Sequence, residues 1–272
     1  MVQDNMIQDS IIQDKETAIL VVSFGTTHLD TLERSIAATE EAIGKSFPEY
    51  TVYRAFLSSI VMRRLEEKHG IHVNNVEQAL EKIEQDGYKK VIVQPTLILG
   101  GIEYDLLASK VQQATKLSIA MGTPLMADRE DCETIADVIM EENPLKEQEA
   151  LVLMGHGTEH TANDMYDMLQ QIFEAREYRC FIGTVEGTPT FEDAVERLKQ
   201  GKVSHAKLLP LMFVAGDHAV NDMAGDEDSL KTLVQEAGIE ASPILRGLGE
   251  SRRVQELYVM RVRKAQQTLK KK

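Results

Sequence analysis

Two pairs of segments in this 272-residue chain resemble each other, which indicates an internal duplication. The first pair is AILVVSFGTTH at residues 18–28 and ALVLMGHGTEH at residues 150–160. The second pair is VIVQPTLILGGIEYD at residues 91–105 and AKLLPLMFVAGDHAVND at residues 206–222. One large domain is compatible with this length. Because the two pairs keep the same order, however, the duplication favours two similar lobes of about 130 residues each.

Short apolar segments alternate with amphipathic ones in both copies. Seven segments have the continuous apolar or β-branched character of buried parallel strands, namely residues 18–23, 51–56, 90–94, 150–154, 179–184, 206–212 and 241–245. Helices are predicted over residues 75–86, behind Asn74, and over residues 191–200, where Thr190 and Asp193 have capping-box spacing. This order predicts right-handed βαβ crossovers and an α/β fold of two doubly wound lobes with parallel sheets; a mixed α+β fold is the alternative.

The predicted lobe boundary falls just before the second copy begins. We expect a frayed polar extension over residues 1–16, an N-terminal α/β lobe over 17–144, and a C-terminal α/β lobe over 145–272. The C-terminal lobe also carries a long basic helix from residue 251 onward, which we expect to pack across one lobe.

Composition narrows the class of partner. The formal charge of −14 argues against nucleic acid and against anionic membranes as partners. No apolar run approaches the ~20 residues that span a bilayer, and the acidic N-terminal residues differ from a signal peptide, so we expect a cytoplasmic protein. Cys132 and Cys180 are far apart and outside any CxxC pair, which excludes a disulfide framework and a thiolate metal site. A small ligand is the expected partner.

The two copies differ in their histidines. His156 stands where the first copy has Phe24, and His218 stands opposite Glu103 if one residue is inserted in the later copy. Since ligands of open α/β sheets bind beyond the carboxyl ends of the strands, residues that follow strands are candidates for a site. His156 and His218 each follow a predicted strand, and so does Glu186. Two imidazoles and a carboxylate suit a divalent first-row metal.

Each of these residues also has a structural interpretation. The glycines on either side of His156 are compatible with an ordinary flexible turn, and a Glu at a strand end is commonly only solvated. His160 aligns with His28, so a shared capping or packing role is as plausible for it as a role in the site. The glycine spacings of a P-loop or a dinucleotide fingerprint are absent, as is a GxSxG elbow, so we expect neither a nucleotide nor any other organic cofactor.

Five motifs carry a resemblance to a known family: VVSFGTTHLDT, QPTLILGGIEYD, LMGHGTEHTAND, GTVEGTPT and LMFVAGDHAVNDM. They resemble the anaerobic sirohydrochlorin cobaltochelatases, class II chelatases that are grouped with ferrochelatases. The resemblance runs from about residue 17 to the last helix. It implies a lyase of cobalamin and porphyrin biosynthesis that inserts Co²⁺ into sirohydrochlorin without ATP, in a cleft between two lobes. It also implies that His156, Glu186 and His218 bind the metal and that His156 acts as the base.

The chemistry of metal insertion agrees with these residue types. Insertion releases two pyrrole protons, and histidine is the side chain whose pKa lies nearest neutral pH. A site without thiolates also binds Co²⁺ weakly enough to release it. Insertion of Fe²⁺ or Ni²⁺ into the same type of tetrapyrrole, and a non-catalytic tetrapyrrole or metal carrier, are the alternatives.

Sirohydrochlorin carries eight carboxylates, which the acidic chain must accommodate through local contacts. The candidate substrate-binding residues are Ser23, Phe24, Thr26, Arg54, Glu103 and Thr158. Phe24 is expected to face the ring, and Glu103 to lie across the cleft from His218. The expected partners are sirohydrochlorin, or precorrin-2, and divalent cobalt; a homo-oligomer is compatible with the sequence.

Overall fold

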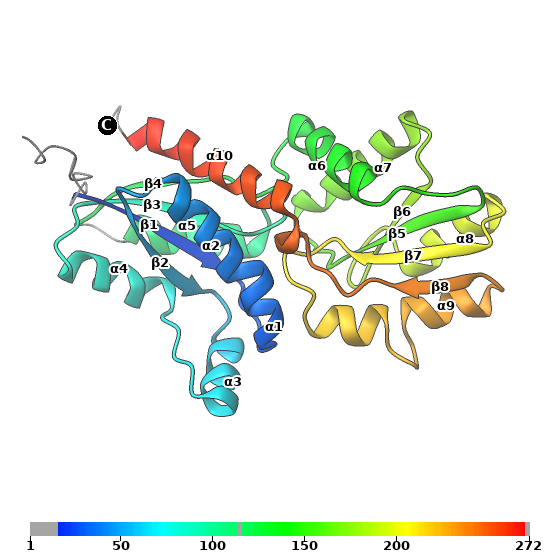
Figure 1. Cartoon of the computed structure of the whole chain (residues 1–272), viewed down its shortest axis with the longest axis horizontal. Coiled ribbons are helices and arrows are strands. Elements are labelled where there is room, and N and C mark those ends of the chain that lie inside the picture. The colour runs from blue at the N-terminus through cyan, green and yellow to red at the C-terminus, as the bar shows by residue number, and fades with distance from the viewer. Residues whose placement is uncertain (1–15, 114–115, 270–272) are drawn as a thin grey trace, which may run out of the picture.

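The computed structural model of the chain describes residues 16–113 and 116–269, and it contains two four-stranded parallel sheets (Figure 1). The first sheet has the order β2-β1-β3-β4, and its strands are β1 (Thr17–Ser23), β2 (Thr51–Phe56), β3 (Lys90–Pro95) and β4 (Ser118–Met121). The second has the equivalent order β6-β5-β7-β8, with β5 (Glu149–Gly155), β6 (Cys180–Thr184), β7 (His205–Pro210) and β8 (Glu240–Pro243). The α/β class and the duplication are confirmed. Of the predicted N-terminal extension, all but Glu16 lies outside the described residues.

One strand was not predicted from the sequence. β4 lies at the edge of the first sheet and pairs only with β3. Of its four residues only Ala120 is buried, and Ser118 is exposed. An edge strand with so little buried surface lacks the apolar run by which the central strands are identified.

Ten α-helices lie between and after these strands in the described part of the chain. They are α1 (Leu29–Thr31), α2 (Ala38–Ser46), α3 (Ser59–His69), α4 (Val76–Gln85), α5 (Ile102–Gln113), α6 (Arg129–Glu142), α7 (Asp164–Ala175), α8 (Phe191–Gln200), α9 (Leu230–Glu236) and α10 (Arg252–Leu269). α8 begins behind Thr190 in a capping box with Asp193, as predicted. α4 is capped by Asn75 rather than by Asn74, and Gln78 completes its capping box. No helix among the described residues is long and apolar enough to cross a membrane.

Both faces of each sheet are covered by helices. Alternate residues of β1 point to opposite faces, so Leu20 packs in a cluster with α4 and α5, while Ile19 packs in a cluster with α2 and α10. The second sheet repeats this pattern: Val152 packs with α8 and α9, and Leu153 packs with α6 and α7. The cluster that holds Ile19 and Leu153 is continuous, so the two lobes share one apolar core.

Two helices exchange lobes. α6 follows the first sheet in sequence but packs against α7 of the second lobe, and α10 follows the second sheet but packs against α2, β3 and β4 of the first (Figure 1). α10 is held there by Tyr258, whose hydroxyl donates to the carbonyl oxygen of Leu97, and by Arg261, which donates to that of Leu125. The predicted ranges 17–144 and 145–272 therefore divide the sheets, but the packing of α6 and α10 crosses that division.

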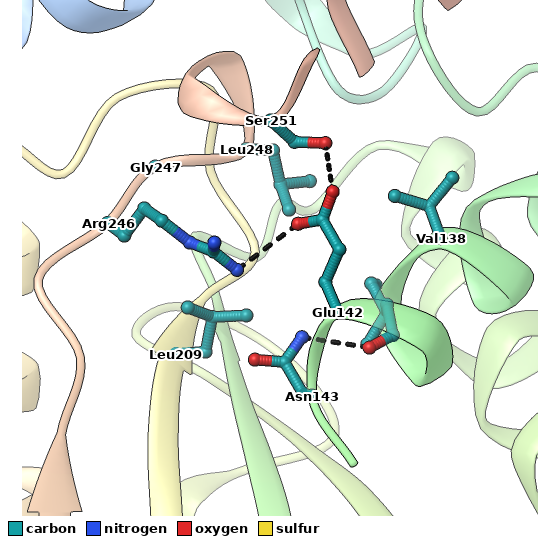
Figure 2. Close-up of a pocket in the computed structure, with 9 residues that line it drawn as sticks. Val138, Glu142, Asn143, Leu209, Arg246, Gly247, Leu248 and Ser251 are labelled. Carbon is teal, nitrogen blue, oxygen red and sulfur yellow. Dashed lines mark hydrogen bonds and ion pairs between the residues drawn. The ribbon is translucent and has the colours of Figure 1, made fainter. Parts of the chain in front are cut away.

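Glu142, the last residue of α6, binds the segment through which the chain returns to the first lobe. Its carboxylate accepts hydrogen bonds from the Ser251 hydroxyl at 2.5 Å and from the Arg246 guanidinium at 3.2 Å (Figure 2). Arg246 and Ser251 belong to the segment that leads from β8 back to α10. One carboxylate thus ties the end of α6 to the connection between β8 and α10.

Candidate active site

A cleft of about 780 Å³ lies between the two lobes, at the carboxyl ends of the strands. Its lining comes from both copies: residues that follow β1 and β3 of the first sheet, residues that follow β5, β6 and β7 of the second, and one face of α3. The described lining includes Phe24, Thr26, His28, Val61, Arg64, Ile102, Glu103, His156, Thr158, Glu159, Tyr166, Glu186, Asp217 and His218.

His156 and His218 meet in this cleft. Their rings pack edge to face, with centroids 4.8 Å apart and an interplanar angle of 87°. His156 directly follows β5, and His218 begins a π-helical turn after β7. Nδ1 of His156 lies 3.0 Å from the Gly157 carbonyl oxygen, and Nδ1 of His218 lies 2.8 Å from a carboxylate oxygen of Asp222. Because both partner atoms are acceptors, each Nδ1 carries the hydrogen, which leaves Nε2 free to bind a metal or a proton.

Glu186 lines the same cleft and is joined to His156 through the main chain. Its backbone N–H donates to the His156 carbonyl oxygen at 2.8 Å, and Glu186 is exposed. Over the described residues, no three His, Cys, Asp or Glu side chains are arranged to hold a metal ion. The three predicted ligands all line one cleft, but they do not form a three-ligand cluster among the described residues.

Four of the six predicted substrate contacts line the cleft: Phe24, Thr26, Glu103 and Thr158. Phe24 is 47% exposed, which leaves its ring accessible to a flat apolar ligand. Direct contact between these four residues and a substrate stays a prediction.

The other two predicted substrate contacts lie away from the cleft lining. Ser23 is only 1% exposed, and its hydroxyl accepts a hydrogen bond from the Thr96 hydroxyl at 2.8 Å. Arg54 donates from Nε to both carboxylate oxygens of Glu40, at 2.8 and 3.0 Å, and burial raises the pKa of that carboxyl. Because both residues lie near strand ends, we expected their side chains to reach the ligand-binding edge of the sheet. Instead, each side chain is hydrogen-bonded within the first lobe, Ser23 to Thr96 and Arg54 to Glu40.

The aligned histidines His28 and His160 link the two lobes and are not among the proposed metal ligands. Nε2 of His28 lies 2.8 Å from a carboxylate oxygen of Asp217 in the second lobe. Nδ1 of His160 accepts from the Ala162 N–H, which caps a short helical turn, and its Nε2 lies 3.3 Å from Asp105 of the first lobe. The capping interpretation therefore holds for His160, and both histidines have an aspartate partner in the opposite lobe.

Three functional candidates were missed in the sequence. Arg64 and Asp217 line the cleft, and Tyr166 lies buried behind His156, where its hydroxyl accepts from the Gly157 N–H at 3.5 Å. Burial raises the pKa of the Tyr166 phenol. Asp217 directly precedes His218, which is a local signal, whereas nothing near Arg64 or Tyr166 in sequence indicates the cleft.

Known proteins resemble this chain in sequence and in fold. The family model for cobalt chelatase (CbiK) matches residues 17–267. The sirohydrochlorin cobaltochelatase of Salmonella typhimurium is 36% identical over 252 residues, which cover 91% of this chain and 96% of that protein. The sirohydrochlorin cobaltochelatase CbiKC of Nitratidesulfovibrio vulgaris is 34% identical over 239 residues, which cover 85% and 84%.

Among solved structures, SirB from Bacillus subtilis with Fe³⁺ superposes with a TM-score of 0.62 at 17% identity, covering 92% of this chain and 95% of that one. The sirohydrochlorin chelatase SirB from Bacillus subtilis subspecies spizizenii, in complex with cobalt, gives 0.61 at 16% identity, covering 93% and 96%. At these identities the likeness concerns the fold, which agrees with the two sheets described above. On the family match and the two curated relatives, the chain belongs to the CbiK family of cobalt chelatases.

Proposed function

We propose that this protein is a sirohydrochlorin cobaltochelatase, which inserts Co²⁺ into sirohydrochlorin without ATP in anaerobic cobalamin biosynthesis. The observation that carries this proposal is the pair of histidine rings, His156 and His218, 4.8 Å apart in an interlobe cleft of a CbiK-family chain. The cleft volume of about 780 Å³ lies within the range of about 300–1,000 Å³ that is typical of ligand pockets.

In this proposal Co²⁺ is a substrate that Nε2 of His156, Nε2 of His218 and the Glu186 carboxylate hold beside the macrocycle. Imidazole and carboxylate are ligands of intermediate strength for cobalt, so the ion can transfer to four ring nitrogens that bind it together. The main-chain hydrogen bond between Glu186 and His156 keeps the backbones of two of these proposed ligands adjacent.

Proton transfer accompanies the transfer of the metal. As the ring nitrogens take up Co²⁺, two pyrrole N–H bonds break and two protons must leave. We assign His156 as the base: its Nδ1–H already donates to the Gly157 carbonyl, so Nε2 accepts one of the two protons, and the other passes to solvent in the cleft. One nitrogen cannot hold a metal and a proton together, so Co²⁺ leaves Nε2 of His156 before or as the proton arrives.

The first lobe supplies the wall against which the macrocycle lies. Phe24 and Ile102 are 47% and 59% exposed although both are large and apolar, and Val61 lines the same side. Apolar side chains left accessible in a cleft favour a flat ring that buries them. The two copies thus have different tasks, with the proposed metal ligands on the second lobe and the ring surface on the first.

The test is an insertion assay followed by absorption spectroscopy. Purified protein, excess sirohydrochlorin and excess Co²⁺ should convert more than one equivalent of tetrapyrrole per protein, without ATP. Conversion that stops at one equivalent would favour a tetrapyrrole or metal carrier and contradict the proposal. Parallel assays with Fe²⁺ and Ni²⁺ compare the metals, since the same ligand types suit all three; faster turnover with either would overturn the choice of cobalt.

A further inference from the structure

The cleft has a charge distribution that does not suit its proposed substrate. Its described lining contains four carboxylates, Glu103, Glu159, Glu186 and Asp217, and a single Arg or Lys side chain, which belongs to Arg64. A polycarboxylate tetrapyrrole entering this cleft meets like charges on both lobes. Binding therefore requires cationic or hydrogen-bonding groups that meet its carboxylates, and Arg64 is the permanent cation in the described lining.

Arg64 reaches the cleft from α3 of the first lobe. Ser58 caps this helix by accepting a hydrogen bond from the Val61 N–H, and Val61 itself lines the cleft. Arg64 follows Val61 by three residues, so both side chains lie on the same face of the helix. This face combines an apolar contact for the ring with a cation placed beyond it.

The donors of Arg64 are largely available. Its recorded ion partner is Asp217, whose nearer oxygen lies 3.8 Å from the guanidinium, a distance longer than a hydrogen bond. The other oxygen of Asp217 is already held by His28 at 2.8 Å. The Arg64 side chain is 52% exposed, so a carboxylate can approach it from the cleft.

Two other arginines show what distinguishes Arg64. Arg54 donates several hydrogen bonds to Glu40 and lies outside the described cleft lining. Arg63 is the neighbour of Arg64 in sequence, but it lies outside the described cleft lining and pairs with Glu67 on its own helix at 3.9 Å. Arg63 is therefore a matched control with the same charge, the same helix and similar exposure.

We propose that Arg64 binds a peripheral carboxylate of the tetrapyrrole and favours tetrapyrroles with many carboxylates over those with few. The proposal rests on the proposed function, since it assigns a contact within the same substrate site. A guanidinium offers two parallel N–H donors to a carboxylate, so the contact fixes the orientation of the macrocycle as well as adding affinity. Arg64 acts on binding, and the metal and proton steps remain with the second lobe.

The experiment compares Arg64→Ala, Arg64→Lys and Arg63→Ala. Sirohydrochlorin is titrated without metal and followed by fluorescence, and KM for sirohydrochlorin and for Co²⁺ is measured separately. Arg64→Ala should weaken sirohydrochlorin binding by roughly 10-fold, as expected for one charge-assisted contact open to solvent, and should leave KM for Co²⁺ near the wild-type value. Arg64→Lys should recover part of the affinity, and Arg63→Ala should bind within about 2-fold of wild type.

Substrate charge supplies a second measurement. Uroporphyrin and coproporphyrin, with eight and four carboxylates, serve as binding probes, and Arg64→Ala should reduce the preference for the former. Arg64→Gln gives the same comparison if the alanine variant does not fold. Equal affinities in the Arg64 and Arg63 variants would overturn the proposal even if the wild type inserts cobalt. If the wild type binds sirohydrochlorin but inserts no metal, the proposed function fails while the binding comparison still tests Arg64.

Discussion

The backbone N–H of Glu186 donates a hydrogen bond to the carbonyl oxygen of His156 over 2.8 Å, so two proposed metal ligands from neighbouring strands are joined through their main chains. Gly157 makes this approach possible. Its φ is +83°, and a β carbon at this position would lie 1.3 Å from the Glu186 carbonyl oxygen. Gly25, the aligned residue of the first copy, also has a positive φ, +105°. The tight turn is therefore shared by both copies, and the second copy uses it to support the site.

Gly157→Ala should separate the loop that carries His156 from the loop that carries Glu186. The substitution combines an unfavourable backbone angle with a main-chain clash, and we expect a loss of about 3 kcal/mol or more in the free energy of unfolding. Gly87→Ala is the control, because Gly87 has a φ of +93° but no atom within 4 Å of an added β carbon. It should cost about 1 kcal/mol. Urea unfolding measures both, and equal losses would contradict the role of the close approach.

His156→Ala and His218→Ala should each reduce cobalt insertion by at least about 10²-fold, because each removes a proposed ligand and His156→Ala also removes the base. Circular dichroism should stay native, since both imidazoles reach into the cleft rather than into the core. His72→Ala, an exposed histidine paired with Glu66, should retain activity. Wild-type turnover in either cleft variant would exclude that histidine from the site.

Asp222 is expected to position His218 through the 2.8 Å contact with Nδ1. Removing such an outer partner of a metal ligand typically costs about 10- to 100-fold in metal affinity or activity. Asp222→Ala should therefore raise KM for Co²⁺ or lower kcat in that range, whereas Asp222→Asn keeps an acceptor oxygen and should recover part of the loss. Asp226→Asn, in the loop that follows the helical turn of Asp222 and 98% exposed, is the control. A purely structural role would instead give equal activity in the alanine and asparagine variants.

Glu149 should make stability depend on acid pH. The backbone N–H of Lys146, the ammonium of Lys207 and the ring of His205 lower its pKa from 4.5 to about 2 in the folded protein. A carboxyl whose folded pKa is lowered stabilises the fold fully above pH 4.5, and this contribution is lost as the pH falls toward 2.

Glu149→Gln removes this titration. The variant should be less stable than wild type at neutral pH, and the difference between the two should shrink as the pH falls below 4.5. Urea midpoints measured across this range test the expectation. Glu81→Gln, at an exposed position of α4, is the control. A difference between variant and wild type that does not change with pH would show that packing, rather than charge, is responsible.

Arg54→Ala should affect stability rather than substrate binding. Arg54 and Glu40 have side-chain exposures of 29% and 13%, so removal of the guanidinium leaves a mostly buried carboxylate without its partner. We expect a loss of about 2 kcal/mol in the free energy of unfolding, with KM for sirohydrochlorin near the wild-type value. Restoration of stability in the double variant Arg54→Ala, Glu40→Ala would support this assignment. A large rise in KM without a loss of stability would instead favour the substrate contact first expected for Arg54.

Local sequence patterns predicted most of the strands and the cleft edge on which the candidate site residues lie. Continuous apolar runs indicated seven of the eight strands, and the duplicated motifs placed His156 and His218 beyond equivalent strand ends. The apolar runs of buried strands and the residues that follow them can be recognised within a few neighbouring positions of the sequence. They were sufficient to bring the two histidines and Glu186 to one cleft edge.

Contacts between distant parts of the chain became visible only in the folded protein. Three features depend on which surfaces meet after the sheets have formed. They are the packing of α6 and α10 on the opposite lobes, the pairing of His28 with Asp217, and the different surroundings of Arg54 and Arg64. Arg54 lies in β2 and Arg64 in the middle of α3, and the sequence alone does not show which of these two cations reaches the cleft. Arg54 faces Glu40 and forms a structural ion pair with it, whereas Arg64 faces the cleft and is a proposed substrate contact.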